Sequence, residues 1–265
     1  MTIVKEKTNE FSKIKKIIAV MSGKGGVGKS SVSSLLAVAL RNKGFEVGIL
    51  DADITGPSIP ILFGINKQRA NADDQGVIPV NTSTGIKVMS FNLALADESE
   101  PVVWRGPLIA DAVRQFYTEV VWGNLDYLVI DLPPGTGDIP LTIMQSIPLD
   151  GLIVVTTPQN VVNLIVRKSI KMAEMLALPI LGIVENMSYF ECPDTHKIVN
   201  IFGKSNIDEA AREMKIDSVT KLPINPDFIE LCNSGDIELA GDIGFTLEEA
   251  FLDKIIEKAG IINQS

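Results

Sequence analysis

Eight consecutive residues near the amino terminus have the types and spacing of a phosphate-binding loop. They are Gly23-Lys24-Gly25-Gly26-Val27-Gly28-Lys29-Ser30, which fit the pattern G-x-x-x-x-G-K-[ST] and precede Ser31. In such a loop the glycines let backbone N–H groups turn toward phosphate oxygens, the lysine reaches the β and γ phosphates, and the hydroxyl can ligate Mg²⁺. The sequence therefore predicts that residues 23–31 bind a nucleotide, that Lys29 is catalytic, and that Ser30 holds Mg²⁺.

A second lysine, Lys24, stands inside this loop. The form GKGGVGKS resembles the deviant Walker A motif of the class that contains MinD, ParA and the nitrogenase iron protein. The resemblance implies a homodimer that encloses ATP, in which Lys24 of each subunit crosses to the phosphates held by the other. There the ammonium group would neutralise charge on the transferring phosphoryl group, as an arginine finger does. We therefore expect Lys24 to be catalytic, the alternative being a solvated loop lysine.

Three aspartates end apolar runs and are expected to complete the nucleotide site. Asp51 and Asp53 follow the run FEVGIL, and Asp131 ends the run DYLVID. Carboxylates at the carboxyl ends of parallel strands face the ligand crevice. The resemblance to the same class implies that Asp53 orients or deprotonates the attacking water and that Asp51 supports the Mg²⁺ shell. Asp131 fits the Walker B acid that holds Mg²⁺ through water. A helix-capping or turn-forming role is the alternative for Asp51 and Asp53.

Two further features concern switching and the choice of base. After Asp131, the loop LPPGTGD (132–138) combines stiff prolines with permissive glycines, which predicts a segment that senses the γ phosphate and moves. Asn186 follows the apolar run LGIVE, and its amide can both donate to and accept from adenine. The guanine signature Asn-Lys-x-Asp does not occur in the sequence, so ATP is the expected nucleotide. An Asn186 that only satisfies its own turn is the alternative.

Several longer motifs resemble the Mrp and ApbC type of iron–sulfur carrier ATPase. They are PVVWRGP (101–107), WGNLDYLVIDLPPGTGD (122–138), VVTTPQ (154–159), ENMSYF (185–190) and IFGK (201–204). The resemblance covers most of the chain. It implies a homodimer that hydrolyses ATP, holds an iron–sulfur cluster between two Cys-x-x-Cys pairs, and passes the cluster to client or assembly proteins.

The sequence departs from this family at the cluster motif itself. Where the family has Cys-Pro-x-Cys, this chain has Cys192-Pro193-Asp194-Thr195, followed by His196. A [4Fe–4S] cluster prefers four thiolates, and two subunits with one cysteine each supply only two. Three interpretations follow. Cys192 and His196 supply two thiolates and two imidazoles across a dimer, Cys192 and an external thiol hold a labile cluster, or the loop binds no metal and keeps only a dimer contact.

The alternation of apolar runs indicates the fold that positions these residues. Short β-branched runs alternate with helical patterns, which predicts an α/β fold with a doubly wound, mostly parallel sheet flanked by helices. The predicted strands lie in IKKIIAVMS, FEVGILDAD, GIKVMSF, LDYLVIDLP, DGLIVVTTP, LPILGIVEN and DSVTKLP. The predicted helices cover about 28–43, 107–122, 160–176, 205–214 and 246–259. A polar, turn-rich stretch from 65 to 85 is expected to form a surface excursion or hairpin.

Composition limits the class of protein. The chain has 265 residues, of which 46% are hydrophobic, so residues 16–265 are expected to form a single domain after a flexible segment 1–15. The net charge of −9 argues against a broad nucleic-acid or membrane surface. No apolar run reaches the roughly 20 residues of a membrane span, and no signal-peptide pattern is present. Two cysteines, Cys192 and Cys232, make no disulfide framework, and Cys232 is expected in the core. We expect a cytoplasmic protein.

Two functions of other classes are compatible with the same nucleotide motifs. A MinD- or ParA-like positioning ATPase would bind a surface, and a nucleotide-switched regulator would bind a protein client without a cluster. The last predicted helix, in TLEEAFLDKIIEKAG, carries more acidic than basic residues, which argues against membrane targeting. Iron binding that depends on Cys192 would distinguish a carrier from a regulator.

Overall fold

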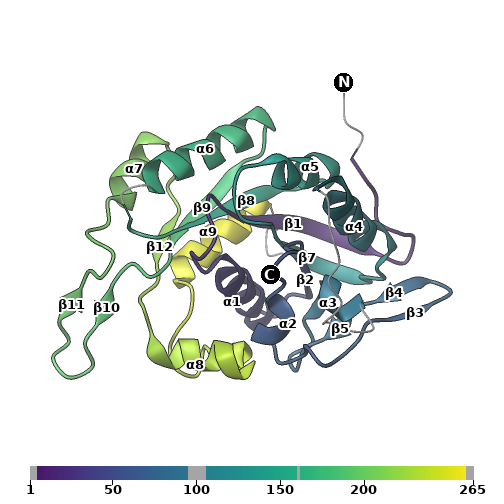
Figure 1. The fold of residues 1–265 in the computed structure, drawn as a ribbon, viewed down its shortest axis with the longest axis horizontal. Helices are drawn as coiled ribbons and strands as arrows, with labels where there is room; N and C mark the ends of the chain where they lie inside the picture. The colour runs from purple at the N-terminus through teal and green to yellow at the C-terminus, as the bar shows by residue number, and fades with distance from the viewer. Residues whose placement is uncertain (1–4, 95–105, 160–161, 261–265) are drawn as a thin grey trace.

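Eight strands form one central sheet in the part of the chain that the structure describes, residues 5–94, 106–159 and 162–260 of a computed structural model. The strand order is β12-β9-β8-β1-β7-β2-β6-β5 (Figure 1), and only β5 runs antiparallel to its neighbour. The strands are β1 (Lys13–Ser22), β2 (Val47–Asp51), β5 (Val80–Asn81), β6 (Lys87–Ser90), β7 (Asn124–Asp131), β8 (Gly151–Thr156), β9 (Ile180–Glu185) and β12 (Val219–Lys221). The predicted α/β fold with a mostly parallel sheet is confirmed.

Helices cover both faces of this sheet. One face carries α1 (Lys29–Asn42), α2 (Ile59–Leu62), α8 (Pro226–Ser234) and α9 (Glu249–Ala259), and the other carries α4 (Gly106–Glu119), α5 (Asp138–Ser146), α6 (Val162–Met175) and α7 (Ile207–Glu213). The short helices α3 (Phe91–Ala94) and η1 (Ile237–Leu239) complete the set among the described residues. Side chains alternate along β1, so that Ile18 and Val20 enter the first core and Ile17 and Ala19 enter the second. Burial on both faces explains why these strands read as unbroken apolar runs.

The strands and helices predicted from the apolar pattern are present, and several short helices occur in addition. All seven predicted strands occur. Each of the five predicted helices is also present, and in the described residues its first and last residues lie within three positions of the predicted ones. The polar stretch 65–85 contains the expected hairpin, formed by β3 (Asn71–Asp73) and β4 (Gly76–Ile78). Helices α2, α3, α5 and α8 and the short helix η1 lie outside these five ranges, and each has nine residues or fewer, which leaves little room for a helical period to show. The motif at 101–107 lies largely outside the described residues.

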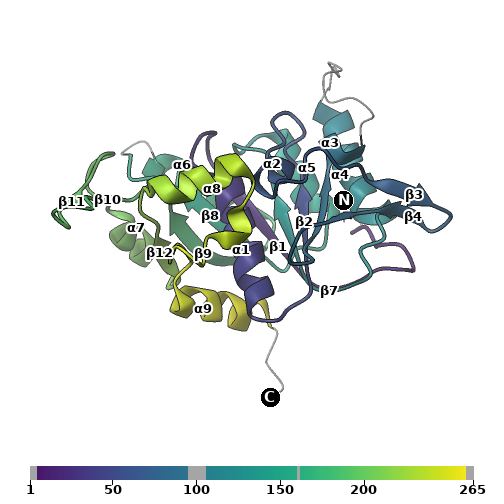
Figure 2. The same ribbon diagram turned by 90° about the horizontal axis from the view of Figure 1, so that it is seen from below.

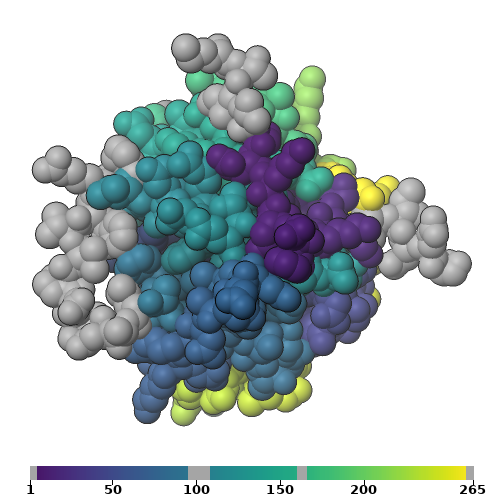
Figure 3. All heavy atoms as spheres, turned by 90° about the vertical axis from the view of Figure 1, so that its right-hand side faces the viewer, coloured from purple at the N-terminus to yellow at the C-terminus, as the bar shows by residue number. Residues whose placement is uncertain are grey.

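The amino-terminal segment joins the fold earlier than the expected boundary at residue 16. Strand β1 begins at Lys13. Before it, Lys5 Nζ donates to the backbone oxygens of Met144 and Ile147 at 2.8 and 2.9 Å, and the Glu6 amide donates to the oxygen of Ser146. A cation at the carboxyl end of α5 complements the helix dipole. Figure 3 shows this segment, in purple, lying on the teal surface of the body.

A two-stranded hairpin projects from the carboxyl end of β9 (Figures 1 and 2). It consists of β10 (Phe190–Glu191) and β11 (Ile198–Val199), which pair antiparallel. The turn between them contains the cluster-like sequence that begins at Cys192. Among the helices of the described residues, none has the length and apolar character to cross a membrane.

Candidate functional site

The phosphate loop connects the end of β1 to the start of α1. Gly26 and Gly28 adopt left-handed backbone angles, with φ of 76° and 77°, which suit glycine. Gly28 also has no room for a side chain, because a Cβ atom there would lie 2.2 Å from Asn186 Nδ2. The loop borders a cavity of about 210 Å³. Its lining residues are Ser22, Lys24, Gly25, Gly26, Gly28, Lys29, Ser30, Ser31, Asp53, Ser58 and Pro134.

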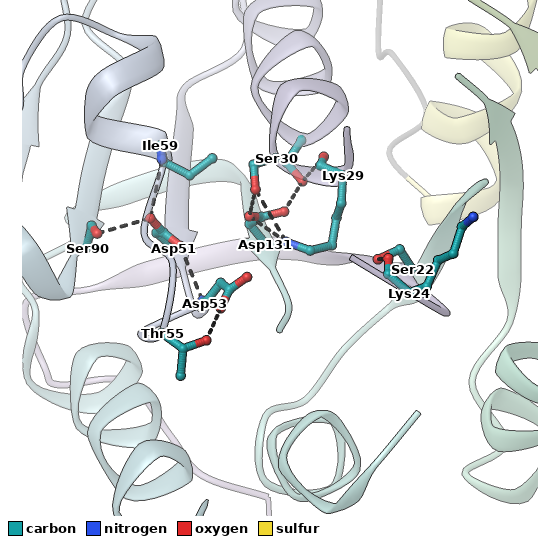
Figure 4. Close-up of polar contacts among 11 residues, drawn as sticks. Ser22, Lys24, Lys29, Ser30, Asp51, Asp53, Thr55, Ile59, Ser90 and Asp131 are labelled. Atoms are coloured by element: carbon teal, nitrogen blue, oxygen red, sulfur yellow. Dashed lines mark hydrogen bonds and ion pairs between the residues drawn. The ribbon is translucent and has the colours of Figure 1, made fainter. Parts of the chain in front are cut away.

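Strand order brings the predicted polar residues to one edge of the sheet. Strands β1, β7 and β2 are neighbours and parallel, so the segments that follow them leave from the same side. Asp51 and Asp131 are register partners at the ends of β2 and β7. The phosphate loop follows β1 beside them. Figure 4 shows the resulting cluster of side chains.

Asp131 is the centre of this cluster. Its carboxylate is fully buried, and Oδ2 lies 2.7 Å from Lys29 Nζ and 2.6 Å from Ser30 Oγ. Oδ1 accepts a hydrogen bond of 2.6 Å from Ser33 Oγ, which is also buried. Because Lys29 is only 6% exposed, its ammonium group and Asp131 form a desolvated ion pair. Ser33 is absent from the predicted site, although its position one helical turn after Ser30 could have indicated it.

Asp51 lies beside this cluster but is occupied by protein donors. Its Oδ2 accepts from Ser90 Oγ at 3.0 Å and from the Ile59 amide at 3.3 Å, and its Oδ1 accepts from the Asp53 amide at 3.2 Å. Burial, followed by the nearby charge of Asp131, raises the pKa of Asp51 to about 8. The structure therefore gives Asp51 a clear role in shaping residues 53–59. Its contribution to a Mg²⁺ shell stays a prediction, and Ser90 is a partner that the sequence analysis missed.

Asp53 and Asn186 lie at two sides of the phosphate loop. Asp53 lines the cavity, where its Oδ1 accepts from Thr55 Oγ1 at 2.9 Å. Asn186 is largely buried, and its Nδ2 donates to the backbone oxygen of Val27 at 3.0 Å. The amide therefore braces the loop in this structure. Activation of water by Asp53 and contact of Asn186 with adenine both stay predictions.

Lys24 is directed away from the other phosphate-loop side chains. Its ammonium group donates to Oε1 of Gln159, which follows β8. In Figure 4 the Lys24 side chain points away from Asp131 and Lys29. Within this chain, Lys29 is thus the lysine that contacts the buried carboxylate. Gln159 was not predicted as a partner, although it stands in the motif VVTTPQ.

The hairpin places Cys192 and His196 on the same turn but on different partners. The Thr195 hydroxyl, together with the backbone amides of Thr195 and Asp194, lowers the pKa of the Cys192 thiol. His196, whose side chain is 79% exposed, instead contacts Glu191 Oε1 through Nδ1 at 2.8 Å. The two residues are also linked through the backbone, because the His196 amide donates to the Cys192 oxygen at 2.8 Å.

No group of three or more His, Cys, Asp or Glu side chains that could hold a metal ion occurs among the described residues of this single chain. Cys232 lies on α8, half-buried against the first core, as expected.

Comparisons with known proteins show which proteins this chain resembles. The family model described as ParA, NUBPL iron-transfer P-loop NTPase, matches residues 13–259. An iron–sulfur cluster carrier protein of Methanocaldococcus jannaschii is 52% identical over 226 residues, which are 85% of this chain and 78% of that protein. The cytosolic Fe–S cluster assembly factor CFD1 of Candida albicans is 39% identical, with 97% of each chain covered.

Solved structures give the same result for the fold. A nucleotide-binding protein of Archaeoglobus fulgidus in complex with ADP superposes with a TM-score of 0.77 at 49% identity, covering 85% of this chain and 88% of that chain. The MinC:MinD complex of Aquifex aeolicus gives a TM-score of 0.66 at 18% identity, covering 93% of this chain and 96% of that chain. The second likeness concerns the fold alone.

Proposed function

This chain belongs to the NUBPL type of iron-transfer P-loop NTPases, and from that membership we propose that it is an iron–sulfur cluster carrier whose ATPase site controls the cluster. The proposal that the site binds ATP is supported by one observation: Lys29 and Ser30 both contact the buried carboxylate of Asp131 beside an open cavity. The cargo part is supported by the carrier and assembly-factor relatives and by an exposed turn with a cysteine.

At this site ATP is the substrate and water is the acceptor of its γ-phosphoryl group. The water oxygen bonds to the γ phosphorus, the bond from that phosphorus to the bridging oxygen breaks, and ADP leaves with the electron pair. Asp53, on the cavity wall, orients the water and accepts its proton. Lys29 exchanges Asp131 for the β and γ phosphates and neutralises the charge that develops on them.

The donor set beside Asp131 suits Mg²⁺, because it consists of oxygen atoms. Ser30 Oγ and the Asp131 carboxylate lie 2.6 Å apart, where a small, hard cation would find both a hydroxyl and, through water, a carboxylate. Mg²⁺ bound with ATP would supply charge neutralisation between the β and γ phosphates. Ser33 holds the second oxygen of Asp131 and so fixes the direction of the first.

The direction of Lys24 supports a homodimer as the hydrolytic species. Within one chain Lys24 is bound to Gln159 and directed away from Asp131. Its proposed target is the phosphate group held by a second copy, so a monomer would lack one catalytic cation. Hydrolysis is then slow at low protein concentration and rises when two chains associate.

The proposed cargo ligand is Cys192. The hydroxyl of Thr195 and two backbone amides favour its thiolate, which is the form that binds iron. Two chains supply two such thiolates, and the remaining ligands come from the client or an external thiol. His196 is an additional candidate ligand through its Nε2 atom, since Nδ1 contacts Glu191 Oε1 and a carboxylate commonly holds the second ring nitrogen of a metal-binding imidazole.

A second candidate function is a nucleotide-switched regulator that binds a protein client without a cluster. This alternative is favoured by the lack of a three-ligand group in the described part of one chain and by the single cysteine in the turn, where the resembled family has two. For either function we propose a cytoplasmic location, in line with the name of the Candida relative, and a protein partner rather than nucleic acid or membrane.

Anaerobic reconstitution with iron and sulfide tests the proposal. Bound iron, acid-labile sulfide and the visible spectrum are measured for the wild type, Cys192→Ala and His196→Ala, with Cys232→Ala as the matched control for a half-buried thiol. A carrier loses iron and sulfide in Cys192→Ala and keeps them in Cys232→Ala, and Thr195→Cys binds more than the wild type. Equal, low iron in the wild type and Cys192→Ala would favour the regulator instead.

A further inference from the structure

Helix α8 lies between the nucleotide site and the hairpin that carries Cys192. In both Figures 1 and 2 it occupies the space between α2 on one side and β10–β11 on the other. Both ends of the helix are fixed to these neighbours through backbone atoms. Such backbone contacts transmit displacement more directly than flexible side chains do.

At its amino-terminal end, α8 is attached to the root of the hairpin. The Ile224 amide donates to the Tyr189 backbone oxygen at 2.6 Å, and Ile224 forms a parallel bridge with Phe190, the first residue of β10. Only Asn225 separates Ile224 from the helix, and its Oδ1 caps the helix by accepting from the Phe228 amide at 3.0 Å. A movement of the helix start therefore moves the base of β10.

At its carboxyl-terminal end, α8 touches the segment that follows α2. Gly235 caps the helix with φ of 85°, and a Cβ atom there would lie 2.5 Å from the Cα atom of Gly64. The two backbones are thus in direct contact, without an intervening side chain. Gly64 is tied to α2 by the hydrogen bond from its amide to the Ile61 oxygen at 3.1 Å.

Helix α2 is in turn an extension of the cavity wall. It begins directly after Ser58, which lines the cavity, and its first amide, that of Ile59, donates to Asp51. Residues 53–58 are the part of this wall that follows the strand end next to Asp131. A γ phosphate that draws these residues inward would carry α2 with them.

We propose that α8 acts as a rigid connector that transmits the nucleotide state of the cavity to the hairpin and so changes the accessibility of Cys192. The chain of contacts runs from residues 53–58 through α2, the Gly64–Gly235 backbone contact and α8 to Ile224 and β10. Close-packed backbones cannot absorb a displacement as a flexible side chain can, so the helix shifts as a body. The proposal rests on the proposed function in one respect, because it assumes that the cavity binds ATP.

The test follows Cys192 reactivity in the full-length chain. Alkylation by iodoacetamide is quantified on the Cys192 peptide by mass spectrometry, with ADP or a non-hydrolysable ATP analogue bound and Mg²⁺ present. In the wild type the two nucleotides give rates that differ by about fivefold or more, a coupling of ordinary size. Gly235→Ala, whose Cβ meets the Gly64 backbone, reduces this difference to less than half.

The matched control is Gly244→Ala. Gly244 also has a left-handed backbone, with φ of 70°, but a Cβ atom there meets nothing within 4 Å. It therefore introduces the same kind of backbone strain without the interhelical contact, and it retains the wild-type difference. Nucleotide affinity and circular dichroism establish that each variant is folded. If Gly235→Ala does not fold, Gly64→Ala tests the contact from the other side, since its Cβ would lie 3.0 Å from the Gly235 oxygen.

Several outcomes would overturn the connector. One is a wild type whose Cys192 alkylation rate is the same with both nucleotides. Another is a folded Gly235→Ala or Gly64→Ala variant that keeps the full difference between the two rates. The third is a Gly244→Ala variant that loses this difference as well. A failure of the proposed function is distinguishable from these outcomes, because it would appear in the separate measurement of bound iron and not in the alkylation rates. A chain that binds no cluster but shows the nucleotide-dependent rate would keep the connector and lose the carrier.

Discussion

Lys24 and Gln159 are joined by a hydrogen bond across 135 residues of sequence, from the lysine ammonium group to the glutamine side-chain oxygen. The bond exists because β1 and β8 are parallel neighbours, with Ser22 opposite Val155, so the segments after these strands lie side by side. It directs the Lys24 side chain away from Asp131 and Lys29 of its own chain (Figure 4), although Lys24 borders the cavity. A contact of the Lys24 ammonium group with phosphate competes with this bond.

Gln159→Ala should therefore lower the protein concentration at which ATPase activity per chain is half-maximal. Both side chains are exposed, so the bond is expected to contribute at most about 1 kcal/mol, or about fivefold in that concentration. Steady-state phosphate release measured over a range of protein concentrations tests this expectation. Lys24→Ala should bind nucleotide but lose hydrolysis, and Gln115→Ala, a change at an exposed glutamine of α4, should behave as the wild type. An unchanged concentration dependence in Gln159→Ala would contradict the prediction.

Replacing Lys29 by alanine should both weaken nucleotide binding and destabilise the free protein. The ammonium group neutralises the fully buried Asp131 at 2.7 Å, and breaking a buried ion pair typically costs about 3–5 kcal/mol. Titration calorimetry with ADP and urea unfolding measure the two effects. Lys29→Ala that binds ADP with the wild-type affinity would show that the loop has been misassigned.

The two serines after the phosphate loop offer a direct comparison. Ser33 Oγ donates to Asp131 Oδ1, whereas the neighbouring Ser34 Oγ is buried with no hydrogen-bond partner. Ser33→Ala should reduce the free energy of unfolding by about 1–3 kcal/mol and weaken Mg²⁺-dependent nucleotide binding, because it leaves a carboxylate oxygen unsatisfied. Ser34→Ala should be neutral or slightly stabilising. Equal effects of the two changes in urea unfolding would refute the assignment.

The stability of the nucleotide-free protein should fall as the pH rises toward about 8. Burial raises the pKa of Asp51 to about 8, so between its ordinary value and 8 the folded state binds one proton more than the unfolded state. The contribution of Asp51 to the free energy of unfolding is fully present at low pH. As the pH rises, this contribution decreases by up to about 1.4 kcal/mol per pH unit until the carboxyl group ionises in the folded state. Asp51→Asn should flatten the slope measured by urea unfolding at several pH values. Identical slopes in both proteins would exclude Asp51 as the source.

Thr195 should control the reactivity of the neighbouring thiol. Its hydroxyl is the main cause of the lowered pKa of Cys192, so Thr195→Ala should move the pH–rate profile of Cys192 alkylation to higher pH. Thr195→Ser keeps a hydroxyl and should stay close to the wild type. The Cys232 peptide serves as an internal reference, since burial raises the pKa of that thiol. A profile for Thr195→Ala that coincides with the wild type would rule out the hydroxyl as the cause.

The sequence alone determined the phosphate loop and the order of strands and helices. The loop can be identified because its function depends on backbone amides and side chains within eight consecutive residues, from Gly23 to Ser30. The strands can be identified because burial on both faces requires unbroken apolar runs. The family could be recognised for the same reason, since its motifs are contiguous.

Only the tertiary structure decided which side chains share a contact. Ser33 on α1 and Asp131 at the end of β7 meet because β1 and β7 are paired, and Ser90 reaches Asp51 because β6 lies beside β2. The structure likewise gave Cys192 and His196 different side-chain partners, because the Thr195 hydroxyl contacts the thiol whereas Glu191 Oε1 contacts the imidazole Nδ1. Distances between residues remote in sequence depend on strand pairing and register, and a linear pattern does not encode these locally.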